Sequence, residues 1–443
     1  MGIDGEYRDV VSMTGPAGAA VQTFKGFELF RTGSELTIPA TIAIVGAGPA
    51  GLIAAEVLAT AGHRVTVYDR LASPARKFLM AGRGGLNLTH SEPLETFLSR
   101  YQDEAGAVRR AVEAFPPSVL IDWANSLGIE TFVGSSGRVF PKAMKASPLL
   151  RAWLRRLDAL GVALKPRHTW RGFSEDGGIV FETPDGNGFT HQADATILAL
   201  GGASWPKLGS DGGWASPLRD AGVAITALQP SNCGVIIPWS AYMAKLEGAP
   251  LKTIAIACGK TTRRGEAVIT RTGLEGGVIY ALSRDIREAL ALGPATITLD
   301  LRADLPLKRL RDRIADAATP KATTTSVLRK GAGLSPAACA LVREPGPLPR
   351  DPDGLAQRIK AVPLQIVALP GLERAISTAG GISQRAINRT FMLAARPGVF
   401  AAGEMLDWDA PTGGYLLQAC FATGVAAASG VLAQLRQRAS EHC

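Results

Sequence analysis

A glycine-rich turn near the start of the chain is a candidate binding site for a phosphate-containing ligand. In the stretch TIAIVGAGPAGLIAAEVLATAGHRVTVYDR, a β-prone apolar run leads into Gly46, Gly48 and Gly51, and Pro49 and Ala50 open a helical segment. In this G-x-G-x-x-G pattern the first glycine makes a tight turn, the second lets a diphosphate approach the backbone, and the third lets helix and strand pack closely. The first turn of such a helix attracts anions. The stretch therefore predicts a site for an adenine dinucleotide.

An acidic residue supports this prediction. Asp69 follows the second expected strand, which begins at Arg64, and it lies 18 residues after Gly51. An acid at about this spacing accepts a hydrogen bond from the adenosine ribose and disfavours the 2′-phosphate of NADP. The fingerprint alone does not separate NAD from FAD.

A cationic, glycine-rich loop follows the second strand, and it helps to decide between NAD and FAD. It reads RKFLMAGRGGLNLTH, residues 76–90. A simple NAD dehydrogenase needs no such loop here, whereas FAD has a second phosphate and a ribityl chain to hold. The alternative interpretation is a mobile basic loop. We expect FAD, with contacts in or just before this loop from Arg70, Lys77, Arg83, Gly84, Gly85, Leu86 and Asn87.

Two later segments return the chain to the same ligand edge. Residues 195–200 form an apolar strand that ends at Gly201–Gly202, and residues 399–402 form another that ends at Gly403–Glu404. In α/β sheets, ligands bind beyond the carboxyl ends of the strands. We therefore expect these four residues to line the cofactor.

The C-terminal helix follows a glycine pair. Thr412 is suited to cap a helix that starts near Gly413, and Gly413 and Gly414 leave no side chain between the helix end and a ligand. A helix N-terminus directed at a flavin stabilises the negative charge of the reduced ring. The alternative is a glycine-capped helix of the core.

Six segments, taken in order, resemble the BaiN-like (YhiN-like) bacterial flavoproteins. They are VGAGPAGL, GRGGLNLT, GRVFPKAMKASPLLRAWLRRL, GLEGGVIYALS, STAGGI and FAAGEMLDWDAPTGGYLLQACFATG. The resemblance implies an NAD(P)/FAD-dependent oxidoreductase with non-covalently bound FAD. It also implies that Glu404 faces the ribityl chain or the phosphates, and that Tyr415 and Leu416 belong to the flavin site. Many members have Cys at the position of Leu86 and Asn at that of Leu416, so side-chain bonds from those two positions are lost here.

The resemblance also implies a domain organisation. The fold class is α/β: a glutathione-reductase-type, Rossmann-like FAD domain interrupted by an inserted α+β cap domain. We expect a flexible extension at residues 1–38, the FAD domain at residues 39–228 and 374–440, and the cap at residues 229–373. The cap is expected to close over the flavin and to select a small-molecule substrate.

Composition limits the remaining classes of protein. The chain has 443 residues, a net charge of +9 and five cysteines. The Lys and Arg residues are scattered along the sequence, so we interpret them as a solvated surface and not as a nucleic-acid site. We identify no uncharged apolar run of about 18 residues and therefore expect no membrane span. Without a C-x-x-C pair or a histidine cluster, we expect no metal site and a reducing cytoplasm.

The function predicted from these observations is a cytoplasmic FAD oxidoreductase. No second G-x-G-x-x-G follows a strand, so no dedicated nicotinamide domain is expected, and a disulfide relay would need a cysteine pair. We expect hydride transfer at flavin N5 to or from a small organic substrate. The flavin would be reduced by transiently bound NAD(P)H or by the substrate itself. The alternatives are an amine or aminoketone oxidase that uses dioxygen, and an RNA-associated flavoprotein.

Overall fold

The computed structural model describes residues 24–28, 39–82 and 84–441. The chain forms two compact units: unit 1 is Met1–Gln229 together with Thr378–Cys443, and unit 2 is Pro230–Ser377. The second boundary lies four residues later than the expected 373. The reason is that residues 374–377 carry no glycine or proline to mark the change of unit before the next strand.

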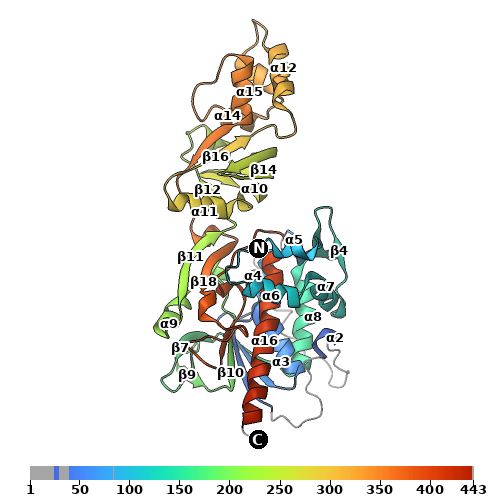
Figure 1. Ribbon diagram of the computed structural model, residues 1–443, viewed down its shortest axis with the longest axis vertical. Helices are drawn as coiled ribbons and strands as arrows, with labels where there is room; N and C mark the ends of the chain where they lie inside the picture. Colours follow the sequence, from blue (N-terminus) through green and yellow to red (C-terminus); the bar gives the residue numbers. More distant parts are fainter. Residues whose placement is uncertain (1–23, 29–38, 83, 442–443) are drawn as a thin grey trace. The chain divides into compact units, whose positions relative to one another are not determined.

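Unit 1 is built on a five-stranded parallel sheet (Figure 1). In spatial order its strands are β19 (Val399–Ala401), β10 (Ala195–Leu198), β1 (Thr41–Val45), β2 (Arg64–Asp69) and β6 (Ala163–Pro166). Val45 at the end of β1 is paired with Tyr68 on one side and Leu198 on the other. The carboxyl ends of β1, β2 and β10 therefore meet at one edge. Strands β10 and β19 are slightly shorter than expected, because the glycine turns begin earlier.

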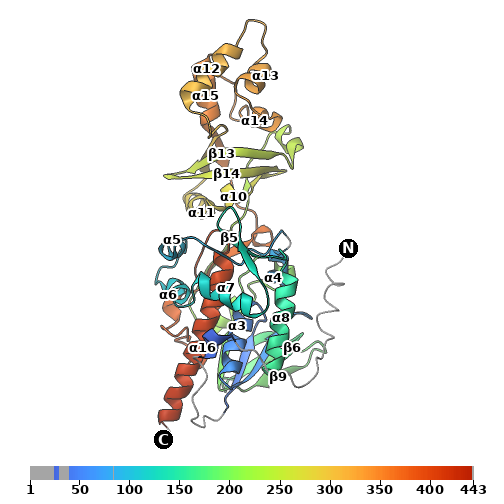
Figure 2. The same cartoon turned by 90° about the vertical axis from the view of Figure 1, so that its right-hand side faces the viewer.

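Helices pack around this sheet to form one hydrophobic core. The main ones are α3 (Pro49–Thr60), α6 (Ala107–Ala114), α7 (Pro117–Ser126), α8 (Ala146–Ala159) and α16 (Tyr415–Glu441). Helix α16 runs the length of the unit beside α3 (Figures 1 and 2). The two helices come close at Gly424, where a Cβ would lie 2.5 Å from the Ile53 side chain.

Two small antiparallel sheets complete unit 1. Strands β7 (Thr169–Phe173), β8 (Ile179–Glu182) and β9 (Gly188–His191) form a meander. The other sheet has the order β3 (Thr89–His90), β5 (Arg138–Pro141) and β4 (Thr131–Val133). The other α-helices among the described residues of unit 1 are α2 (Lys25–Glu28), α4 (Arg76–Ala81), α5 (Leu94–Leu98) and α9 (Ala215–Asp220).

Unit 2 has its own core around a six-stranded antiparallel sheet. Its strands, in spatial order, are β12 (Val235–Ile236), β15 (Gly273–Glu275), β14 (Thr261–Thr270), β13 (Pro250–Cys258), β16 (Ala295–Asp300) and β17 (Val362–Ile366). Helices α10 (Gly277–Tyr280) and α11 (Ser283–Ala291) lie on one side of the sheet. On the other side lie α12 (Leu307–Ala317), α13 (Thr324–Ser326), a π-helical segment (Val327–Gly331), α14 (Pro336–Leu341) and α15 (Pro352–Lys360), as Figures 1 and 2 show.

Strands β11 (Ile225–Ser231) and β18 (Ser377–Ile382) pair with each other where the chain leaves unit 1 and returns to it. The return strand reads STAGGI, and all six of its residues are buried.

One expectation from the sequence needs correction. The proposed flexible extension includes α2, and its Phe24 and Phe27 are buried in the core of unit 1, with Phe27 stacked on Phe115 at 6.3 Å. The rest of residues 1–38 lies outside the described residues. Among the described residues one helix is long and apolar enough to cross a membrane by length and composition, and the absence of a membrane span stays a prediction. Helix α16 has a window with a mean hydropathy of 1.7, of which 61% is buried inside the protein.

Candidate cofactor site

The glycine turn between β1 and α3 has the shape that its sequence predicts. Gly46 has a φ of +107°, and a Cβ there would overlap the carbonyl oxygen of Ala199. A Cβ on Gly51 would overlap the carbonyl oxygen of Gly46, so this glycine allows α3 to pack on the turn. A Cβ on Gly48 would meet no atom within 4 Å. The turn is therefore tight on its inner side and open at Gly48, which leaves room for a ligand at the N-terminus of α3.

The start of α3 also contacts the end of β19. Pro49 is the first residue of the helix, and Ala50 is buried behind it. A Cβ on Gly403, whose φ is +83°, would lie 3.0 Å from the Cβ of Ala50. The expected cofactor residues of the N-terminal and C-terminal segments thus lie together.

Asp69 holds the glycine turn in place. One carboxylate oxygen accepts the backbone N–H of Ala47 at 2.9 Å, and the other accepts that of Leu71 at 2.8 Å. Burial raises the pKa of the Asp69 carboxyl, while these two hydrogen bonds act to lower it. Because Ala47 lies inside the glycine motif, Asp69 connects the ends of β1 and β2.

Lys77 and Glu404 form an ion pair, with Nζ 2.5 Å from Oε2. Lys77 also donates a hydrogen bond to Ser204 Oγ at 2.7 Å. The other oxygen of Glu404 accepts the backbone N–H of Thr378 at 3.1 Å. The side chains of Lys77 and Glu404 are 28% and 13% exposed, so the pair is shielded but still reachable from solvent.

The loop after β10 is held by the same network. Thr378 Oγ1 accepts the backbone N–H groups of Ala203 at 2.8 Å and Ser204 at 3.1 Å. A Cβ on Gly202 would lie 3.0 Å from the carboxyl carbon of Glu404. Gly201 has a φ of +73° and lies beside the Ser210 hydroxyl. Segments from four parts of the chain therefore meet at Glu404.

The glycine loop after α4 contains one unsatisfied polar atom. Leu86 is fully buried and donates its N–H to the carbonyl of Met144 at 2.9 Å. Gly85 has a φ of +109°, and a Cβ on Gly84 would face open space. The side-chain oxygen of Asn87 is buried with no hydrogen-bond partner among the described residues. Arg83 lies outside the described residues.

Arg70 is engaged with protein groups. Its guanidinium pairs with Asp211 at 2.5 Å and donates to the carbonyl of Pro206 at 3.2 Å. Its Nε is buried with no hydrogen-bond partner among the described residues. Arg70 therefore fixes the loop after β10, and its Nε is a donor without a partner among the described residues.

Helix α16 begins at Tyr415, two residues later than expected. Gly413 and Gly414 have φ values of +139° and +95°, which a right-handed helix does not allow. A Cβ on Gly414 would lie 2.6 Å from the Cα of Thr89. The close approach at Gly414 is thus to the backbone of the glycine loop, and this favours the packing alternative for this residue.

Tyr415 and Leu416 contribute mainly to packing. The Tyr415 hydroxyl donates to Glu92 Oε1 at 2.7 Å, and its ring stacks on His90 at 5.7 Å. Tyr101 donates its hydroxyl to the Tyr415 carbonyl at 2.8 Å. Leu416 packs against the core of unit 1.

The residues present fit the diphosphate and the polar parts of FAD. The open turn at Gly48 provides the cradle, and the unpartnered oxygen of Asn87 and nitrogen of Arg70 are polar atoms that a ligand would satisfy. Sequence reasoning missed Ser204 and Thr378. Both lie in segments that it singled out, GGAS and STAGGI, but their roles depend on contacts between distant parts of the chain.

Two curated proteins match most of this chain, including the residues of the candidate site. A 3-dehydro-bile acid delta(4,6)-reductase from Clostridium scindens is 26% identical over 86% of this chain and 97% of its own length. A ribosomal RNA dihydrouridine synthase from Escherichia coli is 24% identical over 88% of this chain and 97% of its own length. A solved 3-ketosteroid-delta4-(5alpha)-dehydrogenase from Rhodococcus jostii is 16% identical, with a TM-score of 0.48 over 91% of this chain and 99% of that one.

The sequence profile of the HI0933-like protein Rossmann domain matches residues 40–430, most of the chain. This range contains the glycine turn, the Lys77–Glu404 pair and all of unit 2. The chain therefore belongs to the HI0933-like family of FAD-dependent oxidoreductases.

Proposed function

We propose that this chain uses bound FAD to reduce a carbon–carbon double bond that is conjugated to a carbonyl group. Saturation of such a bond is common to the reactions in the names of the two curated relatives, a delta(4,6)-reductase and a dihydrouridine synthase. Each relative matches over 97% of its own length, so the likeness includes both units. The structural observation that carries the proposal is the open glycine turn joined through Gly403 to the Lys77–Glu404 pair.

In this proposal different residues of unit 1 bind different parts of FAD. The N-terminus of α3 and the open face of Gly48 receive the diphosphate, and Asp69 orders the turn and faces the adenosine ribose. Lys77 and Glu404 hold the ribityl chain and second phosphate, and Asn87 supplies a hydrogen-bond acceptor. Bound FAD supplies hydride transfer at its N5.

The electron donor in this proposal is NAD(P)H that binds transiently. Outside the turn at Gly46, no G-x-G-x-x-G that follows a strand occurs in the sequence, so in this proposal the nicotinamide nucleotide has no dedicated domain. The two half-reactions would then alternate at one site. The cytoplasm, where NAD(P)H is plentiful, is the expected compartment.

Product analysis tests the proposal. FAD-loaded protein is incubated without oxygen with NADPH or NADH and with either 4-androstene-3,17-dione or a uridine-containing RNA. We expect one of these acceptors to gain two hydrogens, one of them deuterium when the nicotinamide carries deuteride at C4. Protein that is fully loaded with FAD and oxidises amines with dioxygen, but leaves both acceptors unchanged, would contradict the proposal and favour the oxidase alternative.

RNA is a second candidate for the substrate. The relative from Escherichia coli is named for its action on ribosomal RNA, and the chain has a net charge of +9. The name of this relative adds support to the RNA alternative, for which the sequence offered only the net charge.

A further inference from the structure

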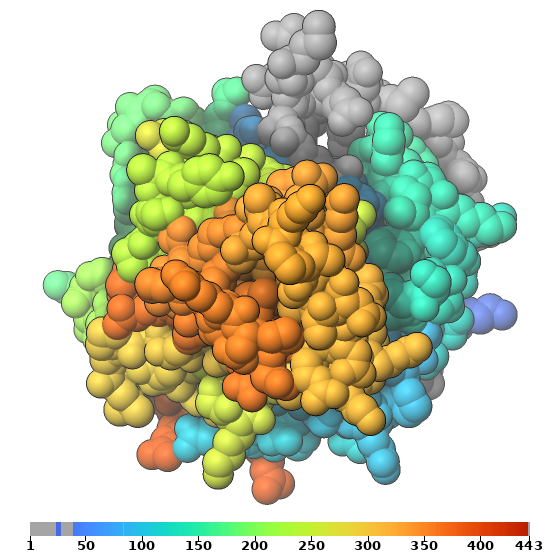
Figure 3. Space-filling model, turned by 90° about the horizontal axis from the view of Figure 1, so that it is seen from above, coloured from blue at the N-terminus to red at the C-terminus, as the bar shows by residue number. Residues whose placement is uncertain are grey.

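The positive charge of the chain is concentrated in unit 2. Residues 230–377 contain 21 Lys and Arg against 13 Asp and Glu, which is +8 of the total +9. Within unit 2, residues 301–360 contain 12 Lys and Arg against six Asp and Glu, a net +6. We call residues 301–360 the helical tip; they include α12 to α15. Figure 3 shows the tip in gold and orange on the face toward the viewer. One contiguous stretch of the sequence therefore carries most of the net charge.

Most acidic side chains of the tip are already engaged. Asp304 and Asp312 pair with arginines of the tip, Asp351 caps α15, and Glu344 accepts hydrogen bonds from Ser240. Seven exposed cations of the tip form no ion pair with any described residue: Lys308, Arg309, Arg313, Lys321, Arg329, Lys330 and Arg350. The tip therefore carries uncompensated positive charge.

Close packing gathers three of these cations. Arg329 and Lys330 lie on the π-helical segment, which touches α12 at Gly331. A Cβ on Gly331 would lie 2.9 Å from the carbonyl oxygen of Arg313. One guanidinium nitrogen of Arg313 lies 3.7 Å from the Cβ position of Gly333, just beyond the segment. These three cations have no acidic partner among the described residues, and π-helical turns occur often at functional sites. A polyanionic ligand would supply the missing negative charge.

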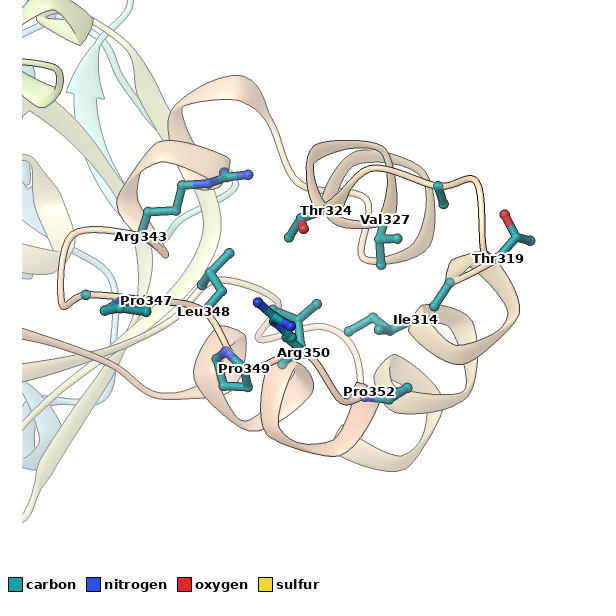
Figure 4. Close-up of a pocket in the computed structure, with 14 residues that line it drawn as sticks. Ile314, Thr319, Thr324, Val327, Arg343, Pro347, Leu348, Pro349, Arg350 and Pro352 are labelled. Carbon is teal, nitrogen blue, oxygen red and sulfur yellow. The ribbon is translucent and has the colours of Figure 1, made fainter.

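A cavity of about 790 Å³ opens in the same tip (Figure 4). Its wall combines apolar side chains, such as Ile314 and Val327, with the guanidinium groups of Arg343 and Arg350. Figure 4 shows Arg350 directed into the ring of lining residues. Arg343 is fixed by a hydrogen bond to Thr325 Oγ1 at 3.0 Å. Apolar surface beside a guanidinium suits an unpaired base next to its phosphate.

We propose that the helical tip of unit 2 is an RNA-binding surface. Arg313, Arg329 and Lys330 contact backbone phosphates, and the cavity beside Arg350 takes an unpaired base. A lipid surface fits less well, because Leu307 is the one large apolar side chain exposed among the described residues of the tip. The inference goes beyond the proposed function, since it concerns binding and not reduction.

Fluorescence anisotropy with the full-length, FAD-loaded protein tests the inference. The probe is a labelled single-stranded RNA of about 20 nucleotides. The test variant is Arg329→Ala/Lys330→Ala. The matched control is Arg263→Ala/Arg264→Ala, which removes two adjacent exposed arginines from β14 in the same unit. Loss of two phosphate contacts should weaken RNA binding about tenfold at about 150 mM salt. It should also reduce the slope of the logarithm of the binding constant against the logarithm of the salt concentration by about 1.4. The control should stay within about twofold of wild type.

Three results would overturn the inference: no RNA binding at about 50 mM salt, equal losses in both double variants, or tighter tip-dependent binding to phosphatidylglycerol vesicles than to RNA. Arg350→Ala should weaken binding of single-stranded RNA more than of duplex RNA. Equal losses of affinity for the two kinds of RNA would contradict a role of the cavity. The Arg329→Ala/Lys330→Ala variant is also tested for reduction of 4-androstene-3,17-dione and of the mononucleoside uridine. Reduction at the wild-type rate would show that a loss of RNA binding is independent of the proposed reaction.

Discussion

Lys77 and Glu404 are 327 positions apart in sequence and meet at 2.5 Å between Nζ and Oε2. Lys77→Met would leave the Glu404 carboxylate without its cation in a partly buried site. We expect a loss of about 1.5–3 kcal/mol in the free energy of unfolding, the range for hydrogen bonds to charged groups. We also expect less FAD per protein after purification. Urea unfolding and the ratio of flavin to protein absorbance measure the two effects.

A control separates the cofactor role from simple stability. Lys142 pairs with Glu130 on the exposed surface of unit 1, and both side chains are more than half exposed. Lys142→Met should change neither FAD content nor stability, because exposed pairs contribute little. Full FAD loading in the Lys77→Met variant would show that this pair is structural only.

Gly414 should not tolerate a side chain. Its φ is +95°, and a Cβ would lie 2.6 Å from Thr89 Cα. Gly161 has a φ of +76°, and a Cβ there would meet nothing within 4 Å. Both alanine variants pay the left-handed backbone cost of about 1–2 kcal/mol, but only Gly414→Ala displaces the glycine loop. We expect Gly414→Ala to be less stable than Gly161→Ala and to lose FAD. Equal unfolding midpoints and equal FAD content would refute this role for Gly414.

We expect the free energy of unfolding of unit 1 to depend on pH through the Glu92 carboxyl. Burial raises the pKa of its carboxyl, but hydrogen bonds from Arg100 and Tyr415 outweigh burial and hold the pKa below its ordinary 4.5. A lowered pKa in the folded state means that this stabilisation is present above about pH 4.5 and is lost as pH falls through the folded-state pKa. Glu92→Gln should therefore cost about 1–2 kcal/mol near pH 7.

The measurement is urea unfolding of wild type and Glu92→Gln between about pH 6 and about pH 3. The difference between their unfolding free energies should shrink as the pH falls. Glu113→Gln, an exposed change on α6, serves as the control and should show a constant difference. A wild-type advantage over Glu92→Gln that grows toward low pH would have the wrong sign.

Catalysis should not pass through sulfur. Burial raises the pKa of the Cys420 thiol to about 12, so it stays protonated at neutral pH, whereas only the thiolate is a good nucleophile. Cys420→Ser should therefore reduce and reoxidise its flavin within about twofold of the wild-type rates. A tenfold loss of turnover with full FAD loading would point to a role for this thiol.

The sequence predicted the elements whose signals are local. The β1–α3–β2 unit with Asp69 depends on short-range glycine spacing, and the structure has these elements and turns where the spacing predicts them. The network of Lys77, Glu404 and Thr378 joins segments that are far apart in sequence, so no spacing rule could predict it.

Two differences between the sequence-based expectations and the structure have local physical causes. The glycine pair before α16 was expected to open the helix, but its positive φ values delay the helix to Tyr415. The charge of the helical tip was missed because its cations are interspersed with apolar core residues and acidic residues, so no long basic run marks it in the sequence.

Stopped-flow absorbance of the FAD-loaded protein without oxygen tests the central claim most directly. The first mixing step adds NADPH or NADH, and the second adds a conjugated enone or a uridine-containing RNA. We predict bleaching of the flavin band by a nicotinamide nucleotide and its return on addition of one acceptor, with the saturated product formed in equal amount. A flavin that is reduced only by amines, and that is reoxidised by dioxygen but by neither acceptor, would contradict the claim.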